Sequence, residues 1–251
     1  MFRKILMVSA IASAGLSMAV MAEESRAFLT TENKFPELGQ LELSYLLENN
    51  QYDGYDFISH NVQARYGLIE NLTARLAVPF AMYDPEEGNS ESGLGDIKLG
   101  FDLLAYEDIF RYPYVIPHVE MAFPTGEEDD GLGGGEFSYG GGISVGTVVY
   151  DCLHYVVDGT YIADADTHTG VTDDAAIGSL SIIWDISERF SVMGEGRLVN
   201  YNDADDTASM IGGGISYAWT ENLGSSIYGA TWPDAVYNED QTLLLKVNYT
   251  F

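Results

Sequence analysis

The chain ends in Leu243-Leu244-Leu245-Lys246-Val247-Asn248-Tyr249-Thr250-Phe251, and this stretch decides the fold. Its odd-numbered residues are all apolar or aromatic, whereas its even-numbered residues include Lys246, Asn248 and Thr250. A period of two with one wholly apolar face predicts a β-strand. The apolar face needs an apolar neighbour, which is either a protein core or lipid.

The same alternation recurs along the rest of the chain. It gives segments of roughly 8 to 12 residues, near the roughly 9 to 11 that a tilted strand needs to cross a bilayer. The segments are 40–48, 56–68, 72–83, 95–105, 112–123, 137–149, 154–163, 175–184, 190–201, 208–219, 223–230 and 241–251. A last strand that stops on an aromatic residue of its apolar face resembles the closing strand of bacterial outer-membrane barrels. We therefore predict an all-β fold, a transmembrane antiparallel up-and-down β-barrel of about 12 strands over residues 40–251.

The N-terminus carries the features of a secretory signal peptide. A basic start is followed by an apolar run over residues 5–20 and by small residues up to Ala22, which is the order that a signal peptidase requires. We expect residues 1–22 to be a signal peptide and residues 23–39 to be an N-terminal periplasmic arm. The alternative is a retained N-terminal anchor, which the acidic pair Glu23-Glu24 disfavours.

The composition excludes several classes of protein. The formal net charge is −28, and a phosphate backbone needs a basic surface, so we expect no nucleic acid as a partner. The 17 Tyr, 11 Phe and 27 Gly argue against a disordered acidic chain. Cys152 is the lone cysteine, so no disulfide forms within the chain, and barrel closure has to hold the fold together.

The connections between segments alternate in length and in charge. Those after the second, fourth, sixth, eighth and tenth segments are short, whereas the others tend to be longer and acidic, and they also contain Asp84, Asp164 and Asp173. Short periplasmic turns opposite longer extracellular loops are the pattern of bacterial outer-membrane barrels. We expect a bacterial outer-membrane location with both termini periplasmic, and outer-membrane lipid and lipopolysaccharide as partners. The predicted extracellular acidic rim is Glu86, Glu87, Glu127, Glu128, Asp129, Asp130, Asp203, Asp205 and Asp206.

The basic residues within the segments all fall on the polar face, together with most of the acidic ones. A basic side chain at the lipid midplane costs about 2 to 4 kcal/mol, so we expect this face to line the lumen. A soluble β-sandwich or barrel is the alternative fold, but it does not account for a charged face opposite the apolar one. The predicted lumen-lining residues are Glu42, Arg65, Arg75, Lys98, Asp102, His118, Glu120, His154, Asp158, Glu195, Arg197 and Lys246.

Two features interrupt the regular pattern. Pro79 and Pro117 each remove a donor from a sheet that has no free edge, so we expect bulges there. The glycine-rich stretches 131–142 and 212–214 mark either bends or close packing beside inward tyrosine rings. Both alternatives stay open at this level.

Several short motifs are shared with a known family. They are Gly95-Asp96-Ile97-Lys98-Leu99-Gly100, Phe123-Pro124-Thr125-Gly126, the glycines at 133–135, and Glu32-Asn33-Lys34-Phe35-Pro36. Through them the chain resembles the meta-pathway phenol-degradation transporter family of outer-membrane proteins. The resemblance implies a barrel related to channels for hydrophobic or aromatic compounds. The chain departs from that pattern in its acidic loops and in its arm of only 17 residues, which we expect to form no plug.

These features favour a passive outer-membrane channel for small solutes. An acidic mouth attracts cations, as rings of Asp and Glu do in cation pores, and the mixed charges of the lumen either line an open path or form a salt-bridge network that fills it. A barrel of about 12 strands lies between filled eight-stranded barrels and open porins, so a structural barrel with a blocked lumen is the first alternative. In that case the acidic loops are candidates for Ca²⁺ or Mg²⁺ binding, although their spacing matches no EF-hand and we assign no metal site.

An enzyme is the second alternative. Two histidine–carboxylate pairs, His118 with Glu120 and His154 with Asp158, share the predicted inner face and offer a general base. His60 falls on the outward face. Because no motif supplies a nucleophile, we assign no catalytic residue and no cofactor and expect a channel rather than a barrel hydrolase.

Overall fold

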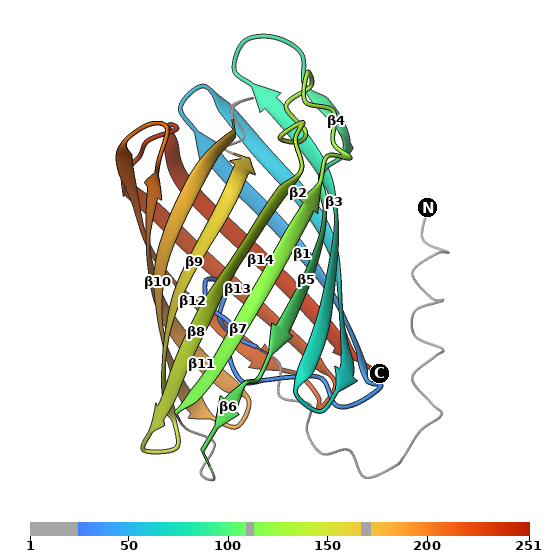
Figure 1. The fold of residues 1–251 in the computed structure, drawn as a ribbon, viewed down its shortest axis with the longest axis vertical. Helices are drawn as coiled ribbons and strands as arrows, with labels where there is room; N and C mark the ends of the chain where they lie inside the picture. Colours follow the sequence, from blue (N-terminus) through green and yellow to red (C-terminus); the bar gives the residue numbers. More distant parts are fainter. Residues whose placement is uncertain (1–24, 109–112, 167–171) are drawn as a thin grey trace.

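The computed structural model describes residues 25–108, 113–166 and 172–251, which form a closed antiparallel barrel (Figure 1). Twelve strands make the wall and two short strands, β4 and β6, lie beside it. The strands are β1 (Leu41–Tyr52), β2 (Tyr55–Ile69), β3 (Leu72–Pro85), β4 (Glu91–Leu94), β5 (Ile97–Leu103), β6 (Tyr106–Glu107), β7 (Tyr114–Phe123), β8 (Ser138–Val149), β9 (Leu153–Asp166), β10 (Thr172–Ser187), β11 (Phe190–Tyr201), β12 (Asp206–Ala218), β13 (Leu223–Asp234) and β14 (Glu239–Thr250). The predicted all-β barrel of about 12 strands is confirmed.

The barrel closes where its last strand meets its first. β14 pairs with β1 over the whole length of both strands, from Glu42 opposite Thr250 to Tyr52 opposite Glu239. The C-terminus and the turns after β2, β8, β10 and β12 lie at one end, which we call the terminus end. The connections after β1, β3, β7, β11 and β13 lie at the other, which we call the loop end. No helix in the described part of the chain is long and apolar enough to cross a bilayer.

The two faces of the wall differ as the alternation predicts. On β14, Leu243, Leu245 and Val247 are exposed on the outside, while Leu244 and Asn248 are buried on the inside. Exposed aliphatic and aromatic side chains cover the outside of the other strands in the same way. An apolar band around a charged interior is the arrangement of a barrel that has lipid as its outer solvent.

The prolines lie at breaks in the hydrogen-bond ladder, and each break contains the expected one-residue bulge, which lies on the partner segment. Pro79 pairs in regular register with Asn61 of β2, and Pro117 pairs regularly with Ile143 of β8. On the other side of β3 the pairing passes from β5 to β4 around Pro79, and on β7 it passes from β5 to β6 around Pro117. Three residues, 95–97, stand opposite residues 78–79, and three residues, 103–105, stand opposite residues 116–117. The extra residue accommodates the donor that each proline lacks, so the expectation of bulges is confirmed.

Several strands extend beyond the ends that the sequence predicts. Asp84 belongs to β3, Asp164 to β9 and Asp173 to β10, although all three were expected in loops. Outside the apolar band a strand is surrounded by water on both faces, so it can continue without apolar alternation. Conversely, the segment predicted over 95–105 is shorter in the structure, where β5 spans Ile97–Leu103. Gly95 and Asp96 separate β5 from β4, which lies before the predicted segment.

Inward glycines leave room for neighbouring rings. A Cβ on Gly212 would lie 2.5 Å from the hydroxyl of Tyr228, and one on Gly146 would lie 2.0 Å from the ring of Tyr114. Gly131 and Gly135, by contrast, have φ values of +70° and +71° and form turns. Both interpretations of the glycine-rich stretches therefore hold, each at different positions.

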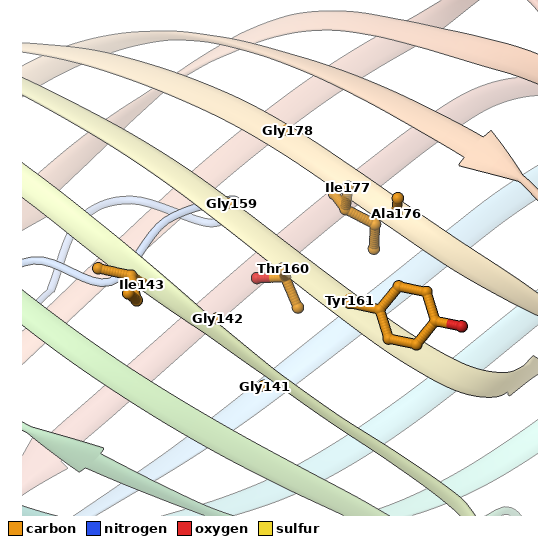
Figure 2. Close-up of a pocket in the computed structure, with 9 residues that line it drawn as sticks. All are labelled: Gly141, Gly142, Ile143, Gly159, Thr160, Tyr161, Ala176, Ile177 and Gly178. Atoms are coloured by element: carbon orange, nitrogen blue, oxygen red, sulfur yellow. The ribbon is translucent and has the colours of Figure 1, made fainter.

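Outward glycines form a shallow depression of about 680 Å³ across β8, β9 and β10 (Figure 2). Its floor includes Gly141, Gly159 and Gly178, and the side chains of Ile143 and Tyr161 stand at its ends. Gly159 pairs directly with Gly178, and both belong to the outer face of the wall. The depression therefore faces the surroundings of the barrel and is separate from the lumen.

Candidate functional site

The inner wall of the barrel holds the charged side chains of the strands. Cross-strand register places the twelve residues expected to line the lumen on one face, opposite the apolar one. They are Glu42, Arg65, Arg75, Lys98, Asp102, His118, Glu120, His154, Asp158, Glu195, Arg197 and Lys246. Whether they contact a solute is a separate question, which depends on what else occupies the interior.

The N-terminal arm lies inside the barrel, along the strands β8 to β11 (Figure 1). The backbone N–H groups of Phe28 and Leu29 donate to the Glu195 carboxylate at 3.1 and 3.2 Å. Thr30 donates its hydroxyl hydrogen to Ser181 at 2.9 Å, and the Thr31 N–H donates to a wall serine at 3.3 Å. The expectation that an arm this short forms no plug was wrong, because extended backbone reaches about 3.3 Å per residue and needs few residues to cross the lumen.

One buried ion pair holds the arm together. Arg26 donates to Glu32 at 2.9 Å and also to Asp185 of β10. Glu32 is 1 % exposed and accepts further bonds from the N–H groups of Arg26 and Ala27. Burial alone would raise the pKa of Glu32, but the charges of Arg26 and Lys34 outweigh it and hold the pKa at about 2. Glu32 is therefore ionised at neutral pH and fixes the turn of the arm.

Asp158 is the centre of a second cluster on the same wall. Its carboxylate contacts His118 Nε2 at 2.7 Å and accepts the hydroxyls of Ser144 and Thr160 at 2.6 Å each. The expected pairing of His118 with Glu120 was wrong. Glu120 lies two residues further along the same strand, whereas Asp158 reaches His118 from β9 across a glycine of β8, Gly142, that leaves space for the ring.

His154 also has a partner other than the expected one. It contacts Asp185 at 2.8 Å, on the neighbouring strand β10, and Asp158 bonds elsewhere. Both histidine–carboxylate contacts are cross-strand links of the wall.

The opposite wall, formed by β2, β3, β5 and β7, is linked by arginines. Arg65 pairs with Glu42 at 3.2 Å and donates to the backbone oxygen of Lys34 in the arm at 2.6 Å. Arg75 donates from Nε to Asp102 at 3.0 Å and from Nη1 to Glu120 at 3.1 Å. The pairs of Arg65 with Glu42 and of Arg75 with Asp102 join neighbouring strands, and the pair of Arg75 with Glu120 crosses β5, so all three stabilise the sheet.

This wall is the part of the interior that solvent reaches. The side chains of Arg75 and Glu120 are 30 % and 38 % exposed, and Lys98 is exposed although its strand register points it inward. On the arm side, by contrast, Glu195 and Asp158 are 3 % and 6 % exposed. The lumen is therefore filled by the arm along one wall and accessible along the other.

The acidic residues at the loop end are of two kinds, buried ones that order the loops and exposed ones that form the rim. Asp96 is buried and accepts the N–H groups of Gly126 and Gly134, both at 2.9 Å, which folds the loop after β7 inward. That loop places Leu132 against Tyr55 on the inner wall. The acids expected as a rim also lie at this end, nearly all exposed: Glu86, Glu87, Glu127, Glu128, Asp129, Asp130, Asp203, Asp205 and Asp206.

Buried acids order the remaining loops. Asp173 accepts the N–H groups of Asp203 and Ala204 at 2.8 and 3.1 Å, and the hydroxyl of Tyr237 at 2.7 Å. Burial and this bond to Asp173 raise the pKa of Tyr237 to about 12. Within the residues that the structure describes, no group of three His, Cys, Asp or Glu side chains is arranged to hold a metal ion.

Sequence reasoning missed the residues that bind the arm. Arg26, Glu32, Ser144 and Ser181 lie outside the predicted set, yet all four contact the arm or belong to it. The available signal was the pairing of opposite charges six residues apart in a segment without alternation. Such a segment has no strand partner, so its charges need a partner within the barrel.

With this geometry established, similarity to solved structures defines the class. Over 91 % of this chain and 100 % of the other, the barrel is similar to the COG4313 outer membrane channel from Pseudomonas putida F1, with a TM-score of 0.72 and 14 % identity. It is also similar to the KdgM porin, with a TM-score of 0.59 and 10 % identity over 84 % of this chain and 99 % of that one. The NanC porin gives a TM-score of 0.59 and 11 % identity, over 82 % and 98 %.

The protein therefore has the fold of an outer-membrane β-barrel of the porin-like kind. No protein-family model matches the chain, and no curated protein matches it either. At these identities the likeness concerns the fold alone.

Proposed function

We propose that the protein is a bacterial outer-membrane channel for small solutes, with its termini in the periplasm and its acidic loop end outside the cell. The observation that carries the proposal is the exposure of Lys98, Arg75 and Glu120 on the inner face of a closed barrel. Charged groups reach water there only if the interior holds a water-filled space beside them. The names of the similar structures, which include a channel and two porins, support the same function.

In this proposal the arm controls how far the lumen is open. It fills the side of the interior along β8 to β11 and leaves the side along β3, β5 and β7 accessible. The acidic rim raises the local concentration of cations at the mouth. The family resemblance implies hydrophobic or aromatic solutes, whereas the charged accessible wall favours polar ones.

Conductance in planar bilayers tests the proposal directly. The full chain should give discrete, cation-favouring conductance steps. Glu32→Gln removes one of the two carboxylates that bind Arg26 and weakens the acceptor of the arm's N–H groups, so it should loosen the arm and raise the conductance or the open probability several-fold. Glu37→Gln is the matched control, because Glu37 is exposed and its side chain contacts no part of the lumen in the described structure.

The buried contacts of the arm favour a second candidate, a structural barrel whose lumen stays blocked. Bilayer conductance distinguishes the channel from the structural barrel. If the wild-type protein and Glu32→Gln are both silent in bilayers while they migrate as folded, heat-modifiable monomers, the protein is a structural barrel and the channel proposal fails.

A further inference from the structure

We infer that the accessible wall of the lumen forms a binding site for small zwitterionic solutes, built from Lys98, Arg75 and Glu120. The inference rests on the proposed channel function and names the solute class that this channel favours. The three side chains come from the adjacent strands β5, β3 and β7, so a single solute can contact them together.

Register gives the site a floor of small residues. Lys98 pairs with Ala77 on one side and Ala122 on the other. The neighbouring row places Gly100 between Arg75 and Glu120. A Cβ on Gly100 would lie 2.9 Å from Nη2 of Arg75, so the glycine lets the guanidinium lie flat across β5. The charged groups thus surround a recess that no large side chain fills.

The site presents one positive and one negative group to the lumen. In the described residues Lys98 makes neither a salt bridge nor a hydrogen bond, and its ammonium group is exposed. Glu120 uses Oε2 for Arg75 and leaves Oε1 for another donor. Asp102 is 1 % exposed and bonds Arg75, so it neutralises that arginine without facing a solute.

A zwitterion matches this charge pattern better than a simple ion does. A solute carboxylate faces the Lys98 ammonium and the edge of Arg75, while a solute ammonium group faces Glu120. Net anions are depleted at the acidic rim before they reach the site, and Lys98 repels simple cations within it. Contacts of this kind in a wet site are weak individually, which suits a channel because a solute has to leave as readily as it enters.

The test is uptake into proteoliposomes made with the full chain. Radiolabelled glycine serves as the zwitterion, erythritol as the neutral solute and glycolate as the anion, all at pH 7. Wild-type protein should admit glycine faster than erythritol, and glycolate most slowly. Lys98→Gln should lower glycine uptake about two- to fivefold, the range for one exposed charge contact, with erythritol uptake unchanged.

Two further variants make the result specific. Lys98→Arg keeps the charge and should restore glycine uptake. Arg189→Gln removes one positive charge from an exposed turn at the terminus end and should change nothing. If Lys98→Gln lowers glycine and erythritol uptake equally, or leaves both unchanged, the zwitterion site is wrong although the channel stands. If wild-type protein prefers glycolate, the site binds anions instead, and if no solute enters, the channel function itself fails.

Discussion

Glu32 shows how a single residue controls an interior that the strands alone would leave more open. It accepts bonds from the Arg26 side chain and from two backbone N–H groups within the arm. Removing one partner of a buried ion pair typically costs about 3 to 5 kcal/mol. Because Arg26 keeps Asp185 as a second carboxylate partner, we expect the cost here at the low end of that range. The docked arm therefore depends on the charge of this carboxylate.

The pKa of Glu32 predicts a pH dependence of arm docking. Because its pKa falls from the usual 4.5 to about 2, its contribution is complete above pH 4.5 and is lost as the pH falls through about 2. The contribution is on the order of 3 kcal/mol. Hydrogen exchange of the arm, compared with Glu32→Gln at each pH, should show protection in the wild type at pH 7 and 5 that the variant lacks. The difference should shrink between pH 4 and 2, and a difference that is constant over this range would contradict the assignment.

Asp96 gives a second prediction at the scale of one residue. Asp96→Ala leaves the N–H groups of Gly126 and Gly134 without their acceptor, at a cost of about 1 to 3 kcal/mol. The loop after β7 should then loosen, which hydrogen exchange of residues 124–135 measures. Asp129→Ala, on the exposed side of the same loop, is the control. Equal exchange in both variants would mean that Asp96 does not hold the loop.

The contact partner of each inward-facing side chain was the hardest feature to predict from the sequence. Alternation predicts that His118, His154 and Asp158 share a face. It does not predict the strand register, which decides which residues of neighbouring strands lie opposite each other. A shift of two residues keeps every face and changes every partner. Both expected histidine pairs were wrong for this reason.

At the scale of a strand, glycines on the two faces of the wall should respond oppositely to substitution. Gly178→Ala adds a Cβ where nothing lies within 4 Å and φ is ordinary, so it should be neutral or stabilise the strand by about 0.5 to 1 kcal/mol. Gly146→Ala would place its Cβ within 2.0 Å of the Tyr114 ring and should destabilise the barrel by more than about 1 kcal/mol. Urea unfolding in lipid vesicles measures both. If the two variants unfold alike, the faces are not distinguished by ring packing.

Strands were the most predictable elements because lipid and water impose opposite demands on alternate residues. The twelve wall strands follow that period. Strand ends were less predictable, since β9 and β10 extend beyond the apolar band into water, where alternation of apolar and polar residues is no longer required. The bulges beside Pro79 and Pro117 could be predicted because proline removes a ladder donor. That the extra residue lies on the partner segment could not be predicted, since the proline itself does not encode it.

At the scale of the whole molecule, the exposed acidic rim is separated in space from the described basic residues. The acidic residues of the rim lie at the loop end, whereas the lysines and arginines that the structure describes lie inside the barrel, in the arm or at the terminus end. We expect the reversal potential in a KCl gradient to favour cations and to move toward zero as salt rises from about 0.1 to 1 M, because the screening length falls from about 10 to 3 Å.

Neutralising one loop isolates the source of this selectivity. Replacing Glu127, Glu128, Asp129 and Asp130 with their amides should reduce the cation preference at low salt and leave the single-channel conductance at 1 M salt nearly unchanged. An undiminished preference would place the selectivity inside the lumen rather than at the rim.

The global arrangement could be predicted from the sequence, but the contents of the lumen could not. Strand number and the inner face follow from the period of two. The path of the arm follows no period, since residues 25–36 reach into the barrel through contacts with strands more than 100 residues away. Only the three-dimensional structure shows that the arm packs against the wall along β8 to β11 and that solvent reaches the wall along β3, β5 and β7.

The pairing of β1 with β14 also constrains the order of assembly. The arm precedes β1 directly, and β1 finds its second neighbour only when the last strand of the chain arrives. Until then the sheet is an open curved surface, and the arm can settle onto the strands β8 to β11 from the side. Once the seam between β1 and β14 has formed, the arm can be exchanged only through an end of the cylinder. The order of the chain thus allows the arm to take its place before the barrel is complete, whereas after closure the arm has to pass through an open end.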